Sequence, residues 1–219
     1  MITFDDIKKD KAIAEYIRKA DESLVALGYT EHSFAHVEKV ASTVEYILTS
    51  LNYSERDIEL GKIAAYMHDI GNLINREDHS QSGALMSFRL LDNMGMAPDE
   101  IATIVTAIGN HDEGTGIPVN AIAAALILAD KSDVRRTRVR NSDISTFDIH
   151  DRVNYSVVES KLEIFEESAA IGLDIKIDTR YSSVMEYFEI FLARMILCRK
   201  AAKTLNLAFE LTINGQRIL

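Results

Sequence analysis

Cysteine is almost absent from the chain: Cys198 is the only one among 219 residues. One thiol cannot form an internal disulfide, so a small disulfide-stapled scaffold is excluded. Cys198 follows Met195 and Ile196 in an apolar helical pattern, where a free cysteine usually behaves as a small buried hydrophobic residue. We therefore expect it to be structural rather than catalytic.

Long apolar runs are also missing. No segment approaches the roughly 20 consecutive apolar residues of a membrane-spanning helix. The N-terminal residues MITFDDIKKDK mix acids and bases and do not resemble a secretory signal peptide. These absences predict a cytoplasmic protein that does not associate with membranes.

Positive charge is in short supply. Lys and Arg number 24 against 34 Asp and Glu, which leaves a formal net charge of −10. Nonspecific binding of nucleic acid needs clustered cations that displace counterions from phosphates, so we do not expect it. A small phosphorylated ligand held in one basic pocket is compatible with this charge.

What the chain does have is a globular composition and a helical period. Hydrophobic residues make up 47% and charged residues 26% of a chain long enough for one core with a small appendage. Apolar residues recur at helical intervals up to about residue 150. The predicted helices cover residues 7–27, 33–51, 54–71, 83–95, 98–108 and 120–136.

The period changes after residue 150. In IGLDIKI (171–177) apolar and polar residues alternate as in a half-buried strand, and KLEIFEE (161–167) is a candidate hairpin partner. A long helix over 183–205 and a strand in LAFELTI (207–213) follow, before an Asn214-Gly215 turn. We predict a mainly α fold, with a helical bundle domain over residues 1–150 and a small α+β extension over 151–219.

The stretch MHDIGN, residues 67–72, carries the most informative pair. His68 and Asp69 stand side by side behind an apolar helical run, and we expect Gly71 to end the helix just after them. One backbone site then offers a neutral nitrogen and a carboxylate that chelate one metal ion, while the second carboxylate oxygen reaches another. A single His-Asp dipeptide is common, however, and carries little weight alone.

Four further histidines and aspartates lie in sequence contexts similar to that of His68 and Asp69. Most of them lie on, or at the end of, an apolar helical pattern, which directs them toward a shared interior. Buried histidines and carboxylates need partners, because an unpaired buried charge is costly, and a metal ion would satisfy all of them together. These residues are His36 in HVEKVA, His79 in HSQSGA, His111 in GNHDEGTG and Asp130 in LILADKSD.

The ordered set of His36, His68-Asp69 and Asp130, in the contexts HVEKVA, YMHDIGN and ILADKSD, resembles the signature of the HD superfamily of metal-dependent phosphohydrolases. The resemblance covers about residues 30–136. It implies a helical HD domain in which these four side chains bind a first metal ion.

The resemblance also implies a second ion, because His79 and His111 match the extra histidines of binuclear members, with Asp69 bridging both ions. Nitrogen and oxygen ligands without a thiolate suit Mn, Fe, Co, Ni or Zn, and we favour Mn or Fe. A water on such an ion loses its proton near neutral pH and attacks phosphorus while the metals neutralise the phosphoryl oxygens. We therefore expect a metal-dependent phosphohydrolase acting on a phosphomonoester or a nucleotide, with Asp69 and Lys131 taking part in catalysis.

Several neighbouring residues are candidate substrate contacts. Lys131, Arg135 and Arg136 follow Asp130 and can hold a phosphate by charge-assisted hydrogen bonds. They can equally be cations on a solvated face at a helix C-terminus. His32 precedes His36 by four residues, so both share one helix face if the helix begins early enough.

Two acidic motifs have two interpretations each. Asp112 and Glu113, directly after His111, can relay protons or form an acidic loop in water. The second His-Asp dipeptide, His150-Asp151, lacks the preceding apolar helical run and the following glycine. We interpret it as a coincidental match that can still line the pocket.

Three alternative functions stay open. GTGIP (114–118) resembles a loop of the HD-GYP branch, which hydrolyses cyclic dinucleotides, but Asn110 and Ile117 replace a histidine and a tyrosine of that branch. Some HD proteins with the same six ligands hold a mixed-valence di-iron centre and oxidise a substrate carbon, and Tyr29 and Glu31 would then be pocket residues. The third alternative is a nucleotide-sensing module whose C-terminal sheet contacts a partner or pairs two subunits in a homodimer.

Overall fold

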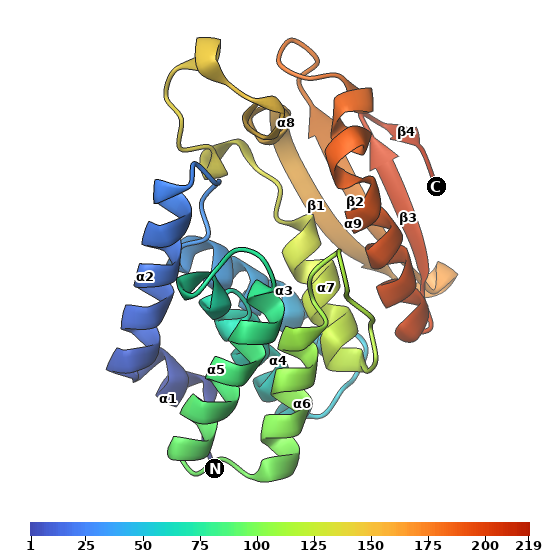
Figure 1. Cartoon of the computed structure of the whole chain (residues 1–219). Helices are drawn as coiled ribbons and strands as arrows, with labels where there is room; N and C mark the ends of the chain where they lie inside the picture. The colour runs from blue at the N-terminus through green and yellow to red at the C-terminus, as the bar shows by residue number, and fades with distance from the viewer.

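The computed structural model describes residues 1–219 as a helical body with a small sheet along one side (Figure 1). This confirms the predicted mainly α fold with a C-terminal α+β extension. The helices are α1 (Phe4–Lys9), α2 (Lys11–Ala26), α3 (Phe34–Ser50), α4 (Glu55–Met67), α5 (His79–Asn93), α6 (Pro98–Gly109), α7 (Ala121–Ser132), α8 (Ile149–Ser156) and α9 (Val184–Thr204). The strands are β1 (Val157–Phe165), β2 (Ala170–Ile177), β3 (Ala208–Ile213) and β4 (Gln216–Arg217).

The N-terminal helical pattern is divided between two helices. Helix α2 confirms most of the helix predicted over residues 7–27, but the predicted start at residue 7 was wrong. Asp10 separates α1 from α2 and has an extended backbone with ψ of 119°. Its carboxylate accepts hydrogen bonds from the amides of Ala12 and Ile13 and so caps the start of α2. Asp10 therefore ends α1 and caps α2, although the apolar pattern continues across it.

Gly71 has a different role from the one predicted. Helix α4 already ends at Met67, and a 3₁₀ turn (Ile70–Leu73) contains the glycine. A Cβ atom on Gly71 would collide with the carbonyl oxygen of His79 and lie 2.5 Å from the amide nitrogen of Gly83. The residue is a glycine because α5 passes directly against this backbone, and not because it ends a helix.

Helix α7 lies at the centre of the helical body. All its residues from Ile122 to Ala129 are buried, because it contacts α3, α4, α6 and α9. A helix that is apolar on every side fits only such a position. Its C-terminal end, which carries Asp130 and Lys131, is thereby held in the interior of the protein.

The sheet has the strand order β1-β2-β3-β4. Strands β1 and β2 form the predicted antiparallel hairpin, and β3 pairs parallel to β2 after the chain crosses over through α9. The Asn214-Gly215 turn leads into β4, which is antiparallel to β3. The predicted hairpin, long helix and final strand are thus confirmed.

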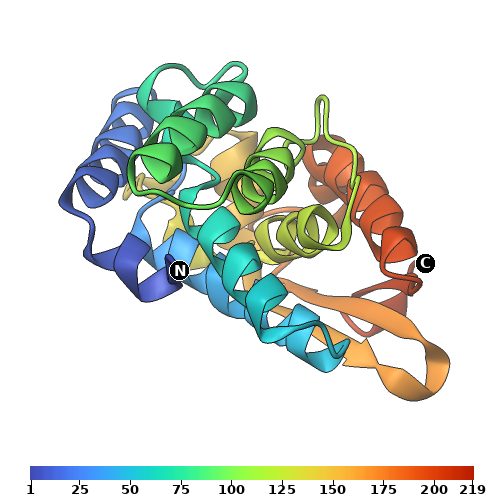
Figure 2. The same ribbon diagram turned by 90° about the horizontal axis from the view of Figure 1, so that it is seen from below.

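Helix α9 packs against both the sheet and α7 (Figures 1 and 2). One cluster of 48 buried residues runs from the helical body into the sheet and α9. The division at residue 150 therefore stays a prediction about domain organisation. None of the helices combines the length and the apolar character needed to span a membrane.

Candidate metal centre

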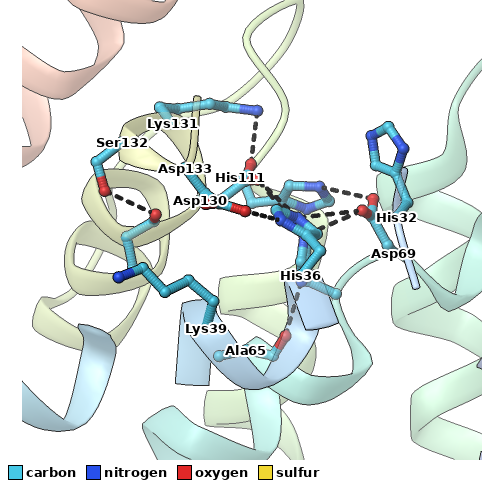
Figure 3. Close-up of polar contacts among 12 residues, drawn as sticks. His32, His36, Lys39, Ala65, Asp69, His111, Asp130, Lys131, Ser132 and Asp133 are labelled. Carbon is cyan, nitrogen blue, oxygen red and sulfur yellow. Dashed lines mark hydrogen bonds and ion pairs between the residues drawn. The ribbon is translucent and has the colours of Figure 1, made fainter. Parts of the chain in front are cut away.

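The six predicted metal ligands lie on, or at the ends of, five helices. Figure 3 shows four of them, His36, Asp69, His111 and Asp130, close together. His36 comes from the first turn of α3, the His68-Asp69 pair follows α4, and Asp130 lies near the end of α7. His79 begins α5 and His111 follows α6. The four histidines and Asp69 are buried, and the side chain of Asp130 is 11% exposed.

The first cluster of donor atoms is formed around Asp130. The Nε2 atom of His36 lies 3.3 Å from Oδ1 of Asp130 and 3.7 Å from Oδ2 of Asp69. The Nε2 atom of His68 lies 3.2 Å from the same Asp69 oxygen and 3.7 Å from Oδ1 of Asp130. The four side chains thus direct their donor atoms at one point.

The second cluster is formed around the other oxygen of Asp69. Oδ1 of Asp69 lies 3.4 Å from Nε2 of His79 and 3.9 Å from Nε2 of His111. The two Nε2 atoms are 3.2 Å apart. Asp69 therefore presents one carboxylate oxygen to each cluster, which is the arrangement of a bridging carboxylate.

Hydrogen bonds at Nδ1 determine which nitrogen of each histidine faces the clusters. Nδ1 donates to a backbone carbonyl in His68, His79 and His111, at 2.7, 3.0 and 2.6 Å. A carbonyl only accepts, so Nδ1 carries a hydrogen, and Nε2 is the nitrogen that a metal ion can bind once it carries no proton. His36 instead bonds through Nδ1 to Oδ2 of Asp133 at 2.8 Å.

Two of the four inward nitrogens lack hydrogen-bond partners within the chain. Nε2 of His36 and Nε2 of His68 are buried without any hydrogen bond. The Nε2 lone pairs of His79 and His111 face each other, which is repulsive in neutral rings. A cation at each cluster removes both problems, so the donor set fits two metal ions with nitrogen and oxygen ligands.

The electrostatics of the site also favour cations. Burial disfavours the charged form of Asp69, but His68 outweighs burial and holds the pKa of Asp69 well below its usual value. Burial likewise opposes the imidazolium of His68, yet Asp69 and Asp130 raise the pKa of His68 to about 10. Burial, and then the charge of His68, hold the pKa of His111 well below its usual value. The clusters are dominated by ionised carboxylates.

Two residues that the sequence did not point to hold the ligands in place. Asp133 orients His36 and accepts a hydrogen bond at 2.9 Å from Nε of Arg135. Asn72 donates from Nδ2 to Oδ1 of Asp69 at 3.0 Å. The sequence signal that could have indicated them is their spacing, because Asp133 follows Asp130 by three residues and Asn72 follows Asp69 by three. Outer partners of this kind set the orientation and basicity of metal ligands.

A cavity of about 400 Å³ opens onto the two clusters. Only three of its 19 lining residues are hydrophobic, so it suits a polar ligand. The lining includes His32 and Lys131, two of the candidate substrate contacts, and also His150 and Asp151. The second His-Asp dipeptide thus forms part of the cavity wall and is not part of either cluster.

Lys131 contacts a candidate metal ligand directly. Its Nζ lies 2.8 Å from Oδ2 of Asp130 and 2.6 Å from Oε2 of Glu113. Glu113 also accepts a hydrogen bond from Nε of Arg194 in α9 at 3.0 Å. Burial opposes ionisation of Glu113, but Lys131 and Arg194 outweigh it and keep the pKa of Glu113 far below its usual value. Glu113 therefore stays ionised, which argues against the proton relay, one of the two interpretations of this residue.

The predicted phosphate contacts Arg135 and Arg136 do not line the cavity. Arg135 pairs with Asp133 and Glu31. Arg136 donates to the carbonyl of Tyr155 at 2.6 Å and stacks on its ring. The arginines that do line the cavity are Arg76, Arg138 and Arg194.

His32 reaches the cavity by a route other than the predicted one. Helix α3 begins at Phe34 with Ser33 as its N-cap, so His32 precedes the helix that carries His36. Its Nδ1 donates to the carbonyl of Thr30 at 2.7 Å. Burial above all holds the pKa of His32 well below its usual value, so the ring is neutral.

Of the residues that the alternative functions depend on, some line the cavity and others do not. Tyr29 lines the cavity, but Glu31 does not, because its carboxylate accepts from the amide of Ser33 at 2.8 Å and pairs with Arg135. Residues 114–118 of the GTGIP loop are absent from the lining. The loop instead turns back on itself through a hydrogen bond from Gly116 to the carbonyl of Asp112 at 2.7 Å.

Comparison with known proteins agrees with this geometry. The chain is 24% identical, over 211 residues, to the uncharacterized protein MJ1020 of Methanocaldococcus jannaschii, with 85% of this chain and 79% of that protein covered. The family model described as HD domain matches residues 33–152, more than half of the chain. These residues include all six side chains of the two clusters. The chain therefore belongs to the HD domain family, within the HD superfamily of metal-dependent phosphohydrolases.

Proposed function

We propose that the protein is a binuclear metal-dependent phosphohydrolase that cleaves a small phosphomonoester, such as a nucleotide. The observation that carries the proposal is the position of Asp69 between two clusters of inward-facing histidine nitrogens. Divalent ions held there would lower the pKa of a water and neutralise phosphoryl oxygens. Nitrogen and oxygen donors suit Mn or Fe, which we favour, and also Co, Ni or Zn.

The chain's own residues would prepare the site in three ways. Asn72 and Asp133 keep Asp69 and His36 in a fixed orientation. Lys131 holds the outer oxygen of Asp130, so that its Oδ1 stays directed at the first cluster. Such preorganised groups need no rearrangement when negative charge develops on a phosphoryl group.

The polar cavity supports a small, charged substrate. Four basic side chains line it, namely Arg76, Lys131, Arg138 and Arg194. A guanidinium can bind phosphate through two parallel hydrogen bonds. The volume of about 400 Å³ is within the range of small-molecule sites.

The test is phosphate release from a panel of nucleotides, other phosphomonoesters and cyclic dinucleotides in the presence of Mn. Wild-type protein is compared with Asp69→Ala, and both are first examined for folding by circular dichroism. We expect turnover of a monoester by the wild type and none by the variant. Turnover that survives in Asp69→Ala, or inactivity of folded wild type across the panel, would contradict the proposal. In the second case, oxygen consumption by iron-loaded protein tests the oxygenase alternative.

A further inference from the structure

Two arginines reach the cavity from distant parts of the chain. Arg138 lies in the segment after α7, and Arg194 lies in α9, which belongs to the C-terminal extension. Neither is among the six clustered ligands, and neither was predicted as a substrate contact. Together they connect the HD domain to the part of the chain that the family match leaves out.

Arg138 is held rigidly and still has donors to spare. The residue is 4% exposed. Its Nε donates to the carbonyl of Glu31 at 2.8 Å and its Nη1 to the carbonyl of Asp133 at 2.7 Å. Its Nη2 has no hydrogen-bond partner within the chain. Oδ2 of Asp133 lies 3.8 Å from Nη1, a longer contact than the two hydrogen bonds, so the Nη2 group stays available for a ligand in the cavity.

Arg194 is fixed in a similar way. Its Nε donates to Glu113 at 3.0 Å, and its guanidinium lies 4.2 Å from the centroid of the Phe191 ring. Stacking on an aromatic ring fixes the plane of a guanidinium. Both Nη atoms are without partners in the chain, so two parallel donors remain for a ligand.

The charge balance of the cavity calls for an anion. Five acidic side chains line it, against four basic ones, so two divalent ions would make the net charge positive. Burial lowers the pKa of Arg138, and the positive charge of Arg194 acts in the same direction, while the charges of Asp133 and Asp130 oppose both. An oxyanion bound in the cavity that both arginines line would offset this repulsion.

We propose that Arg138 and Arg194 form an oxyanion-binding site that receives the phosphoryl group of the substrate beside the metal centre. Helix α9 then supplies half of the phosphate site, which gives the C-terminal extension a function in substrate binding. This inference rests on the proposed function in one respect, which is that the bound oxyanion belongs to a phosphomonoester.

The test uses Mn-loaded full-length protein and inorganic phosphate as the probe, with binding measured by isothermal titration calorimetry. We expect Arg194→Gln to weaken phosphate binding about tenfold or more, since a charge-assisted hydrogen bond is lost. Arg199→Gln is the matched control, because Arg199 lies exposed on the same helix away from the cavity. Arg194→Lys keeps the charge beside Glu113 but not the paired donors, and we expect an intermediate loss.

Mn content and the midpoint of thermal unfolding are measured for every variant. Unchanged phosphate affinity in either Arg194 variant with normal Mn content would overturn the inference, as would a wild type that binds no phosphate. If Arg194→Gln fails to fold, Arg194→Lys and Arg138→Lys decide the matter by the same criterion.

The outcomes separate this inference from the proposed function. Phosphate binding that depends on Arg194, without turnover of any phosphoester, would uphold the site and reject the hydrolase. Turnover that requires Asp69 but has the same KM in Arg194→Lys and wild type would uphold the hydrolase and reject the site.

Discussion

The Nδ1 atom of His36 lies 2.8 Å from Oδ2 of Asp133, and His36 is the only clustered histidine whose outer nitrogen meets a carboxylate. Asp133 is 4% exposed and also contacts Arg135 and Arg138. Burial opposes its charge, but the hydrogen bond from His36 and the charge of Arg138 keep the pKa of Asp133 far below its usual value. A buried, ionised carboxylate thus raises the basicity of one ligand of the first cluster.

Replacing this carboxylate should weaken metal binding. We expect Asp133→Asn to reduce the Mn affinity of the first site by about 10- to 100-fold, the usual effect of losing an outer partner of a histidine ligand. The measurement is a calorimetric titration with Mn. Asp174→Asn, at an exposed position of β2, serves as the control and should bind Mn as the wild type does. Equal Mn affinity in Asp133→Asn and wild type would show that the contact has no positioning role.

The two clusters predict a defined change in metal stoichiometry. We expect His111→Ala to lower the bound metal from about two ions per chain to about one, because the second cluster keeps only His79 and a shared Asp69. Metal content after gel filtration, measured by inductively coupled plasma mass spectrometry, gives the answer. His150→Ala removes a histidine from the cavity wall and not from a cluster, so it should keep both ions. A wild type that holds a single ion would refute the binuclear assignment.

Gly71 provides a stability prediction. We expect Gly71→Ala to lower the free energy of unfolding by about 1 to 3 kcal/mol or more, because the new methyl group meets the backbone of α5. Urea unfolding followed by circular dichroism measures the change. In Gly109→Ala the nearest atom would be the Cβ of Ala84 at 3.6 Å, an ordinary contact, and we expect a change within about 0.5 kcal/mol. Similar unfolding curves for both variants would contradict the close approach of α5.

Cys198 provides a prediction about reactivity. Burial raises the pKa of its thiol to about 12, so at pH 8 almost no thiolate is present in the folded state. A raised pKa leaves the neutral thiol as the main form at every pH below about 12. Because the thiolate is the reactive species, we expect alkylation by iodoacetamide to be at least about 100-fold slower in folded than in urea-unfolded protein. Mass spectrometry over time measures both rates, and comparable rates would show that the thiol is accessible.

Much of the fold was predictable because buried residues recur along the chain at the intervals typical of helices and strands. The apolar residues of α3, α4 and α7 repeat at helical intervals, and those of β2 alternate. The break at Asp10 was not predictable from that period, since the apolar pattern continues across it while a side-chain cap ends one helix and starts the next.

The candidate substrate contacts were harder to predict than the candidate metal ligands. Residues 133–138 leave α7 and end in a single 3₁₀ turn (Arg136–Arg138), which is too short to have a repeating face, so sequence spacing could not tell which arginine would face the cavity. Arg138 turned toward it because its backbone and side chain pair with Glu31, in a loop more than 100 positions earlier. Arg135 and Arg136 are engaged by Glu31 and Tyr155 instead.

The helical class and the C-terminal strands could be predicted from the amino-acid sequence because they follow from local periodicity. The six candidate ligands could be named because their residue types and order resemble the HD signature. Only the tertiary structure decided that Asp69 divides its two oxygens between the clusters, that Asp133 supports His36 and that Arg194 reaches the cavity. The physical reason is that these contacts join segments far apart in the chain, and their geometry depends on how the helices pack around α7.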